Sequence, residues 1–167
     1  MNKKLLILGA GQYSFVARDI AIESGYGKIS FLDDCSELAI GKLWDFPNFA
    51  DEYKEAFVAI GNASLRLELT EKLTQCGFRA ANLISPKAFV SPSAHLEFGI
   101  AIEPMAVVQA NAFIGTGTII SSGAVIRHNA ILGKCCHADC GCIVPSDCRS
   151  PTKPKSPAEQ FSAIIKF

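Results

Sequence analysis

Two histidines near the end of the chain are its first candidates for chemistry. His128 and His137 stand nine residues apart. An imidazole titrates near neutral pH and can act as a general base when an acceptor holds its other ring nitrogen. The ordinary alternative for each histidine is a polar surface residue. Their spacing is half a turn of the repeat described below, which weakens that alternative.

A glycine turn near the N-terminus is the second candidate. Gly9 and Gly11 follow an apolar run, and Gln12 and Tyr13 begin the segment after them. Glycines at such a turn let backbone amides approach a phosphate at a helix N-terminus. Ser14 stands where a dinucleotide fingerprint has glycine, so a tight turn without a ligand stays open as the alternative.

Acidic and polar residues follow two further apolar runs. Asp33 and Asp34 come about 22 residues after Gly11, where a carboxylate can accept hydrogen bonds from a ribose or a base. Their alternative is a solvated turn. Gly61 and Asn62 end the next run and are expected at the same sheet edge. A dinucleotide-binding fold is built from two mononucleotide-binding halves. This chain has room for one half, which predicts binding of a mononucleotide group rather than NAD.

The elements that must position these residues form an α/β domain. An apolar run, a helix with an apolar face and a second apolar run make a βαβ unit, and a helix capped by Asn62 or Ser64 follows a third run. We expect a Rossmann-like domain over residues 1–84. Its predicted strands cover residues 5–8, 28–32, 56–60 and 80–84, with an extra edge strand at 40–43.

A hexapeptide repeat fills the second half of the chain. Ten positions from Val90 to Val144 are spaced six apart, nine of them are aliphatic, and a small residue stands two positions before nine of the ten. This period predicts a parallel β-helix in which each coil is buried by its neighbours. We assign it to residues 85–148, and residues 149–167 to a cap or tail.

Outward positions of this β-helix are partly apolar. We expect them to form a stripe that needs a partner, and hence a homo-oligomer. The residues of this predicted stripe are Val107, Phe113, Ile119, Val125 and Ile131.

Metal binding is the tempting interpretation of seven cysteines, but their spacing argues against it. Cys136, Cys142 and Cys148 continue the row of small inward residues, and no CxxC occurs. Cys135 and Cys140 lie off that row, and whether they are exposed and what they do stays open. A zinc site of three histidines is disfavoured, since the third lies 33 residues before His128. We therefore predict no metal.

Composition excludes several classes of protein. Basic and acidic residues number 16 each, so nothing points to a nucleic-acid partner. A 49% hydrophobic composition supports a packed core. The apolar run after the basic start is too short for a signal peptide or a membrane span. We expect a cytoplasmic protein with no membrane partner.

Taken together, four segments resemble one family. They are GAGQYS at residues 9–14, FLDD at 31–34, VAIGN at 58–62 and GAVIRHNAILGKCCHADCG at 123–141. This combination is similar to the sugar acyltransferases, which include sialic acid O-acetyltransferases and N-acetyltransferases of UDP-4-amino-sugars. The resemblance implies a left-handed β-helix and a homotrimer with active sites between subunits. It also implies acetyl transfer from acetyl-CoA to an amine or hydroxyl of a nucleotide-activated sugar.

The resemblance also assigns roles to residues. His128 falls on the catalytic base, with Asn129 beside it as a hydrogen-bond acceptor where the family often has an acidic residue. His137 falls on the histidine that helps to position the acyl donor, with Gly123 and Gly141 nearby. The residues that fall on or near the nucleotide-sugar site are Gly9, Gly11, Gln12, Tyr13, Asp33, Asp34, Gly61 and Asn62.

One alternative from another class stays open. The repeat register ends at Cys148, whereas the family uses later coils for coenzyme A. The alternative is a trimeric nucleotide-sugar-binding module with weak or no catalysis.

Overall fold

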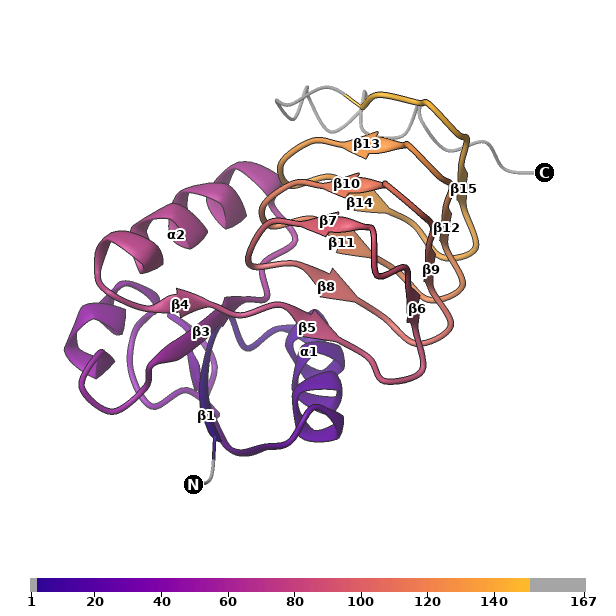
Figure 1. Cartoon of the computed structure of the whole chain (residues 1–167). Coiled ribbons are helices and arrows are strands. Elements are labelled where there is room, and N and C mark those ends of the chain that lie inside the picture. The colour runs from indigo at the N-terminus through magenta and orange to yellow at the C-terminus, as the bar shows by residue number, and fades with distance from the viewer. Residues whose placement is uncertain (1–2, 151–167) are drawn as a thin grey trace. The chain divides into compact units, whose positions relative to one another are not determined.

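The computed structural model describes residues 3–150. The chain divides into two compact units, of which the first ends at Leu83 and the second begins at Ile84. Figure 1 shows strands and helices in the first unit and a stack of short strands in the second. Most of the cap or tail predicted for 149–167 lies outside the described residues.

A parallel sheet in the order β2-β1-β3-β4 forms the centre of the first unit. Its strands are β1 (Lys3–Leu8), β2 (Tyr26–Leu32), β3 (Glu55–Val58) and β4 (Arg79–Ala80). The four apolar residues that end β1 are fully buried, as a central parallel strand requires. The three strands predicted before residue 61 are confirmed, although β3 ends two residues early.

Two helices accompany this sheet, α1 (Gln12–Glu23) and α2 (Ala63–Gln75). Asn62 is the N-cap of α2, because its Oδ1 accepts a hydrogen bond from the Leu65 amide at 3.0 Å. The choice left open between Asn62 and Ser64 is thereby settled. Across residues 3–150, no helix is both long and apolar enough to cross a membrane.

The segment between β2 and β3 differs from its prediction. An isolated bridge joins Phe31 to Ala39, and a 3₁₀ helix, η1 (Leu43–Phe49), follows. Leu43 and Phe46, three residues apart, are both buried in the core of this unit. The edge strand predicted at 40–43 is wrong, because the pairing with β2 is limited to the bridge at Ala39 and the 3₁₀ helix already begins at Leu43.

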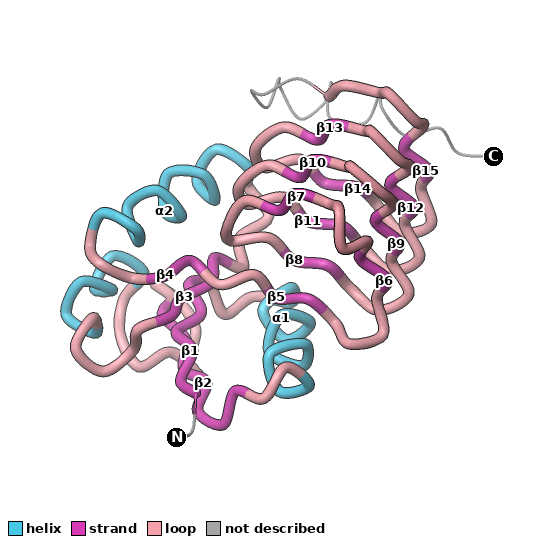
Figure 2. Tube along the Cα trace, in the orientation of Figure 1, coloured by secondary structure: helices cyan, strands magenta, loops and turns pink. Residues whose placement is uncertain are grey.

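Strands of two residues build the parallel β-helix of the second unit. Figure 2 shows them as short magenta segments separated by loops. They are β5 (Leu83–Ile84), β6 (Phe89–Val90), β7 (His95–Leu96), β8 (Ala101–Ile102), β9 (Val107–Val108), β10 (Phe113–Ile114), β11 (Ile119–Ile120), β12 (Val125–Ile126), β13 (Ile131–Leu132), β14 (His137–Ala138) and β15 (Ile143–Val144).

Three parallel sheets form the sides of each coil. We call β5-β8-β11-β14 the first face, β6-β9-β12-β15 the second face and β7-β10-β13 the third face. Val107 pairs with Val125, so one coil is 18 residues. The second residue of each strand and a small residue before it pack into one core cluster. The predicted inward rows are therefore confirmed, including the three cysteines of the small row.

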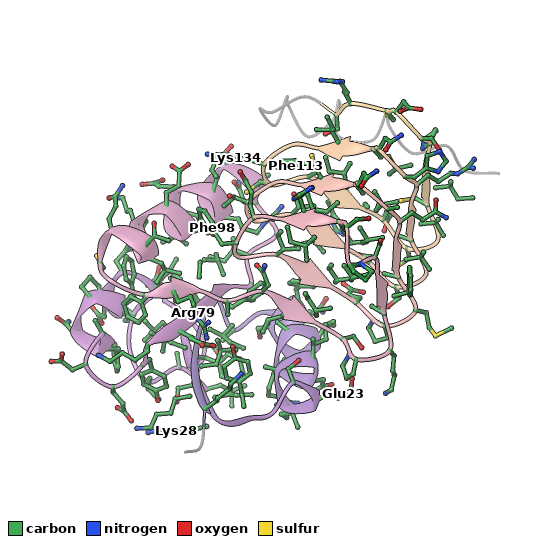
Figure 3. All side chains as sticks on the ribbon, in the orientation of Figure 1. Glu23, Lys28, Arg79, Phe98, Phe113 and Lys134 are labelled. Atoms are coloured by element: carbon green, nitrogen blue, oxygen red, sulfur yellow. The ribbon has the colours of Figure 1, made fainter. Side chains whose placement is uncertain are left out.

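The prediction of one apolar stripe is wrong, because its five residues lie on three different faces. Val107 and Val125 lie on the second face, Phe113 and Ile131 on the third face, and Ile119 on the first. Phe113 is labelled in Figure 3. A step of six residues moves to the next face, and only a step of 18 returns to the same one. Ile119 is also only 2% exposed.

A different apolar row does share one face. On the second face, Phe89, Val107, Val125 and Ile143 pair in register as the outward residues of successive strands. Phe89 is 57% exposed, and the other three are partly buried. We call these four residues the second-face row.

The corners of the coil are columns of residues with left-handed backbone. Each column repeats at 18 residues, with φ between 53° and 71°. Glycine and asparagine adopt this conformation at little cost, and they supply most of these positions. The columns are Gly99, Gly117 and Cys135; Met105, Gly123 and Gly141; and Asn111, Asn129 and Asp147.

All seven cysteines are free thiols. Of the two cysteines left open, Cys140 is exposed, whereas the side chain of Cys135 is only 2% exposed. Cys135 occupies a left-handed corner and donates its amide to the Thr116 carbonyl at 2.7 Å. Burial raises the pKa of Cys142, which leaves this thiol protonated and unreactive at neutral pH.

Candidate functional site

His128 stands at the coil corner after β12 and is exposed. Two other coils hold it. The Gln109 Oε1 atom accepts a hydrogen bond from the His128 amide at 3.1 Å, and the Ser146 hydroxyl lies 3.3 Å from its Nδ1 atom. When Nδ1–H donates to Ser146, Nε2 is unprotonated and can accept a proton. This geometry is that of a general base at a surface corner.

The side chain of Asn129 stabilises the coil corner and is not hydrogen-bonded to the His128 imidazole. Its φ is 58°, its Oδ1 accepts a hydrogen bond from Asn111 at 3.4 Å, and its Nδ2 donates to Asp147 at 3.3 Å. Ser146, and not Asn129, lies within hydrogen-bond distance of the His128 ring. Ser146 was missed, although it lies one coil, or 18 residues, after His128.

His137 begins β14 on the first face and is exposed. Its Nε2 atom lies 3.0 Å from the hydroxyl of Ser121 on the preceding coil. His128, by contrast, lies between the second and third faces, and the whole of β13 separates the two histidines along the coil. A single β-helix therefore presents the two rings on different sides.

The two glycines predicted near the donor have a structural reason of their own. Gly123 and Gly141 are stacked corner residues with φ of 71° and 66°. A Cβ at Gly141 would meet nothing within 4 Å, whereas one at Gly123 would lie 3.9 Å from Gly141. Backbone conformation is therefore enough to explain glycine at both positions, and a donor contact there stays a prediction.

A repeated clamp, not foreseen from the sequence, ties neighbouring coils at their corners. The residue after the inward aliphatic of a strand extends an oxygen to the amide 19 residues later. The pairs are Glu97 with Thr116 at 2.7 Å, Glu103 with Ser122 at 3.0 Å, and Gln109 with His128 at 3.1 Å. The signal in the sequence is an acidic or amide side chain at this position in three consecutive hexapeptides.

The glycine turn of the first unit contains two kinds of glycine. Gly9 has a φ of 98°, and a Cβ there would lie 3.0 Å from the Ala59 carbonyl oxygen, so the fold itself requires glycine. Gly11 and Gly61 have ordinary φ values and nothing within 4 Å of a Cβ. Glycine at these two positions is thus not required by packing within the chain, and it leaves space for close approach of a ligand.

Asp33 connects this turn to the loop after β2. Its Oδ2 accepts a hydrogen bond from the Ala10 amide at 2.8 Å, and its Oδ1 accepts from the amides of Cys35 and Ser36 at 2.9 and 3.0 Å. These bonds, led by that from Ala10, lower the pKa of Asp33. Asp34 accepts from the Leu43 amide at 3.0 Å. Both carboxylates therefore shape the loops at this edge.

The remaining predicted residues lie at the same ends of β1 and β3. Gln12 and Tyr13 form the first turn of α1, whose N-cap Gly11 supplies no side-chain hydrogen bond. Asn62 caps α2 as described. Arg66, which the sequence analysis missed, is only 1% exposed and donates to the carbonyls of Ile60 and Gly61 at 2.7 and 2.9 Å. It fixes the loop that carries Gly61.

Metal-ligating side chains do not gather anywhere in residues 3–150. No group of three or more histidine, cysteine, aspartate or glutamate residues there could hold an ion.

Comparison with known proteins places both units. The PglD N-terminal domain family matches residues 4–73. PerB from Caulobacter crescentus, solved with CoA and GDP-perosamine, is 31% identical with a TM-score of 0.73, and the match covers 82% of this chain and 68% of that one. A histidine-to-alanine mutant of the GDP-perosamine N-acetyltransferase from the same organism, solved with the same ligands, is 28% identical over the same shares, with a TM-score of 0.73. The acetyltransferase domain of PglB from Neisseria gonorrhoeae FA1090, solved with acetyl coenzyme A, is 28% identical with a TM-score of 0.68, over 89% of this chain and 94% of that domain.

Proposed function

Because this chain belongs to the family of sugar acyltransferases that combine a PglD N-terminal domain with a β-helix, we propose that it transfers an acetyl group from acetyl-CoA to a nucleotide-activated sugar. The group on the sugar that accepts the acetyl is an amine or a hydroxyl. The observation that carries the proposal is His128, an exposed corner imidazole fixed through its backbone by Gln109 and through Nδ1 by Ser146. Its Nε2 atom is the proton acceptor.

Acetyl transfer then follows from this arrangement. As the amine nitrogen attacks the thioester carbonyl, His128 takes the proton that the nitrogen loses. A backbone amide at a coil corner stabilises the oxyanion of the tetrahedral intermediate. The carbon–sulfur bond breaks, the proton passes to the sulfur, and coenzyme A leaves as the thiol. His137 helps to position the acyl donor, next to the corner of Gly123 and Gly141.

The first unit is proposed to bind the nucleotide-sugar as a Rossmann-like domain. The parallel strands β1, β2 and β3 end side by side, so the loops that follow them meet at one edge. The N-terminus of α1 attracts phosphate, and the space at Gly11 and Gly61 admits the ligand. Asp33 and Asp34 hold these loops, with Gln12, Tyr13 and Asn62 around them.

We also propose that the β-helix is left-handed and assembles as a homotrimer. The second-face row is an apolar surface that a second copy would cover. A trimer also lets His128 of one subunit meet His137 of a neighbour, which one coil keeps on separate sides. A Val125→Asp variant should dissociate the trimer in light scattering, while Phe113→Lys on the third face should not. A wild-type monomer at micromolar concentration would exclude this assembly.

The activity is tested directly with a panel of acceptors. The chain is incubated with acetyl-CoA and GDP-, UDP- or CMP-linked 4-amino-sugars, and both thiol release and the mass of the sugar product are measured. We expect one nucleotide-sugar to gain one acetyl group. Saturable binding without any product across the panel would instead support the non-catalytic binding module.

A further inference from the structure

A buried carboxylate is connected to His137 through one serine hydroxyl. Glu103 follows β8 and is 7% exposed, and Ser121, one coil further on, is 4% exposed. The Glu103 Oε2 atom accepts hydrogen bonds from the Ser122 amide at 3.0 Å and the Ser122 hydroxyl at 3.1 Å. Its Oε1 atom lies 3.4 Å from the Ser121 hydroxyl.

This carboxylate makes no ion pair with a lysine or arginine in the part of the chain that the structure describes. A buried charge is costly unless hydrogen bonds and an opposite charge compensate it. The nearest titratable cation along its hydrogen bonds is His137, reached through Ser121 alone.

The direction of these bonds follows from the single hydrogen of a hydroxyl. Ser121 lies between the Glu103 carboxylate and the His137 Nε2 atom, which is 3.0 Å away. A carboxylate can only accept, and a bond to a charged acceptor is about twice as strong as a neutral one. The Ser121 hydrogen therefore points to Glu103, and Ser121 accepts a hydrogen bond from Nε2–H of His137.

We infer that Glu103 is a positioning residue that acts through Ser121 to hold neutral His137 in the Nε2–H tautomer and to pair with its imidazolium form. Nδ1 is then the ring nitrogen that gains the proton. This inference deepens the proposed function, on which its catalytic meaning rests.

We call the connection from Glu103 through Ser121 to His137 the relay. Comparison with the other two corner clamps shows that neither of them is part of such a relay. Glu97 makes the same clamp to Thr116, but Gly115 stands one coil after Glu97 and offers no hydroxyl. Gln109 makes its clamp to His128 with a neutral amide. Glu103 thus combines a clamp with a hydroxyl bridge to a histidine.

The tautomer of His137 tests the inference without any substrate. Imidazole ¹⁵N shifts distinguish a protonated from an unprotonated ring nitrogen, and they are recorded on the full chain about two pH units above the ordinary histidine pKa. We expect Nε2–H in the wild type. Glu103→Leu should move His137 toward the Nδ1–H tautomer, because the Ser121 hydrogen then turns to Nε2. Glu103→Gln has one carbonyl oxygen, which the Ser122 amide takes, so its NH2 group faces Ser121 and His137 should again move toward Nδ1–H.

Two further variants separate the relay from the clamp. Glu97→Leu removes an equivalent clamp and should leave the His137 tautomer unchanged. Ser121→Ala keeps the Glu103 clamp to Ser122 but breaks the bridge, so it should give mixed tautomers even if Glu103→Leu fails to fold. An Nδ1–H tautomer in the wild type, or no change in Ser121→Ala, would overturn the inference.

Kinetics then connect the relay to acetyl transfer. If the acceptor panel yields a product, Glu103→Leu and Glu103→Gln should each lower kcat about tenfold, while Glu97→Leu should keep most of it. If the panel yields none, the proposed function fails while the tautomer result still decides the role of Glu103.

Discussion

The Nδ1 atom of His128 lies 3.3 Å from the hydroxyl of Ser146, which stands one full coil further along the chain. The two residues are 18 positions apart, and the β-helix stacks them at the same corner. The ring of the proposed base is therefore oriented by the next coil.

Replacement of His128 by alanine should abolish turnover without unfolding the protein. The side chain is exposed at a corner and packs in no core, so the melting temperature should stay that of the wild type. Loss of a general base lowers kcat by at least about a hundredfold. His95→Ala is the matched control, because His95 is also an exposed histidine of the β-helix and has no proposed role. Wild-type kcat in His128→Ala would remove it as the base.

Replacement of Ser146 by alanine should reduce activity far less. One hydrogen bond to the imidazole is lost, which corresponds to a fall in kcat of about two- to tenfold, with little change in KM. Ser146→Thr keeps the hydroxyl and should restore most of the rate. Equal rates in the alanine variant and the wild type would mean that the hydroxyl does not orient the ring.

Asp33 should contribute stability that depends on pH. Its pKa is lowered in the folded state by three amide donors, so its contribution is present above the unfolded pKa of about 3.9 and is lost as pH falls through the folded value. Asp33→Asn should lower the free energy of unfolding at pH 7 by about 1–3 kcal/mol, and this difference should shrink below about pH 4. Urea unfolding measures both effects. Asp19→Asn, an exposed position on α1, serves as the control and should change stability by less than about 0.5 kcal/mol.

The glycines at the edge of the parallel sheet should separate into two classes. Gly11→Ala and Gly61→Ala should fold normally, because a Cβ meets nothing there, yet weaken nucleotide-sugar binding. Gly9→Ala should lower the melting temperature, because its φ is 98° and its Cβ would press on the Ala59 carbonyl. Calorimetry with the acceptor found in the panel measures binding. Unchanged affinity in Gly11→Ala and Gly61→Ala would move the ligand away from this edge.

Local pattern was enough to predict most of the first unit. The wholly apolar run that ends β1 and a helix capped by Asn62 or Ser64 are short-range signals; the strand was confirmed, and the structure chose Asn62 as the cap. The segment that became η1 carries no such pattern, so its helix depended on burial of Leu43 and Phe46 against the rest of the unit. The roles of Asp33 and Arg66 were equally hidden, because their partners are backbone groups of other loops.

The sequence by itself determined that the second half is a parallel β-helix and which of its residues face inward. Burial of aliphatic side chains imposes a period of six that is visible in one dimension. Only the tertiary structure decided which outward residues meet, because a three-sided coil brings residues 18 apart into contact and sends residues six apart to different faces. For this reason the single stripe was wrong, and the partners of the histidines, Ser146 and Ser121, emerged only when the coils were stacked.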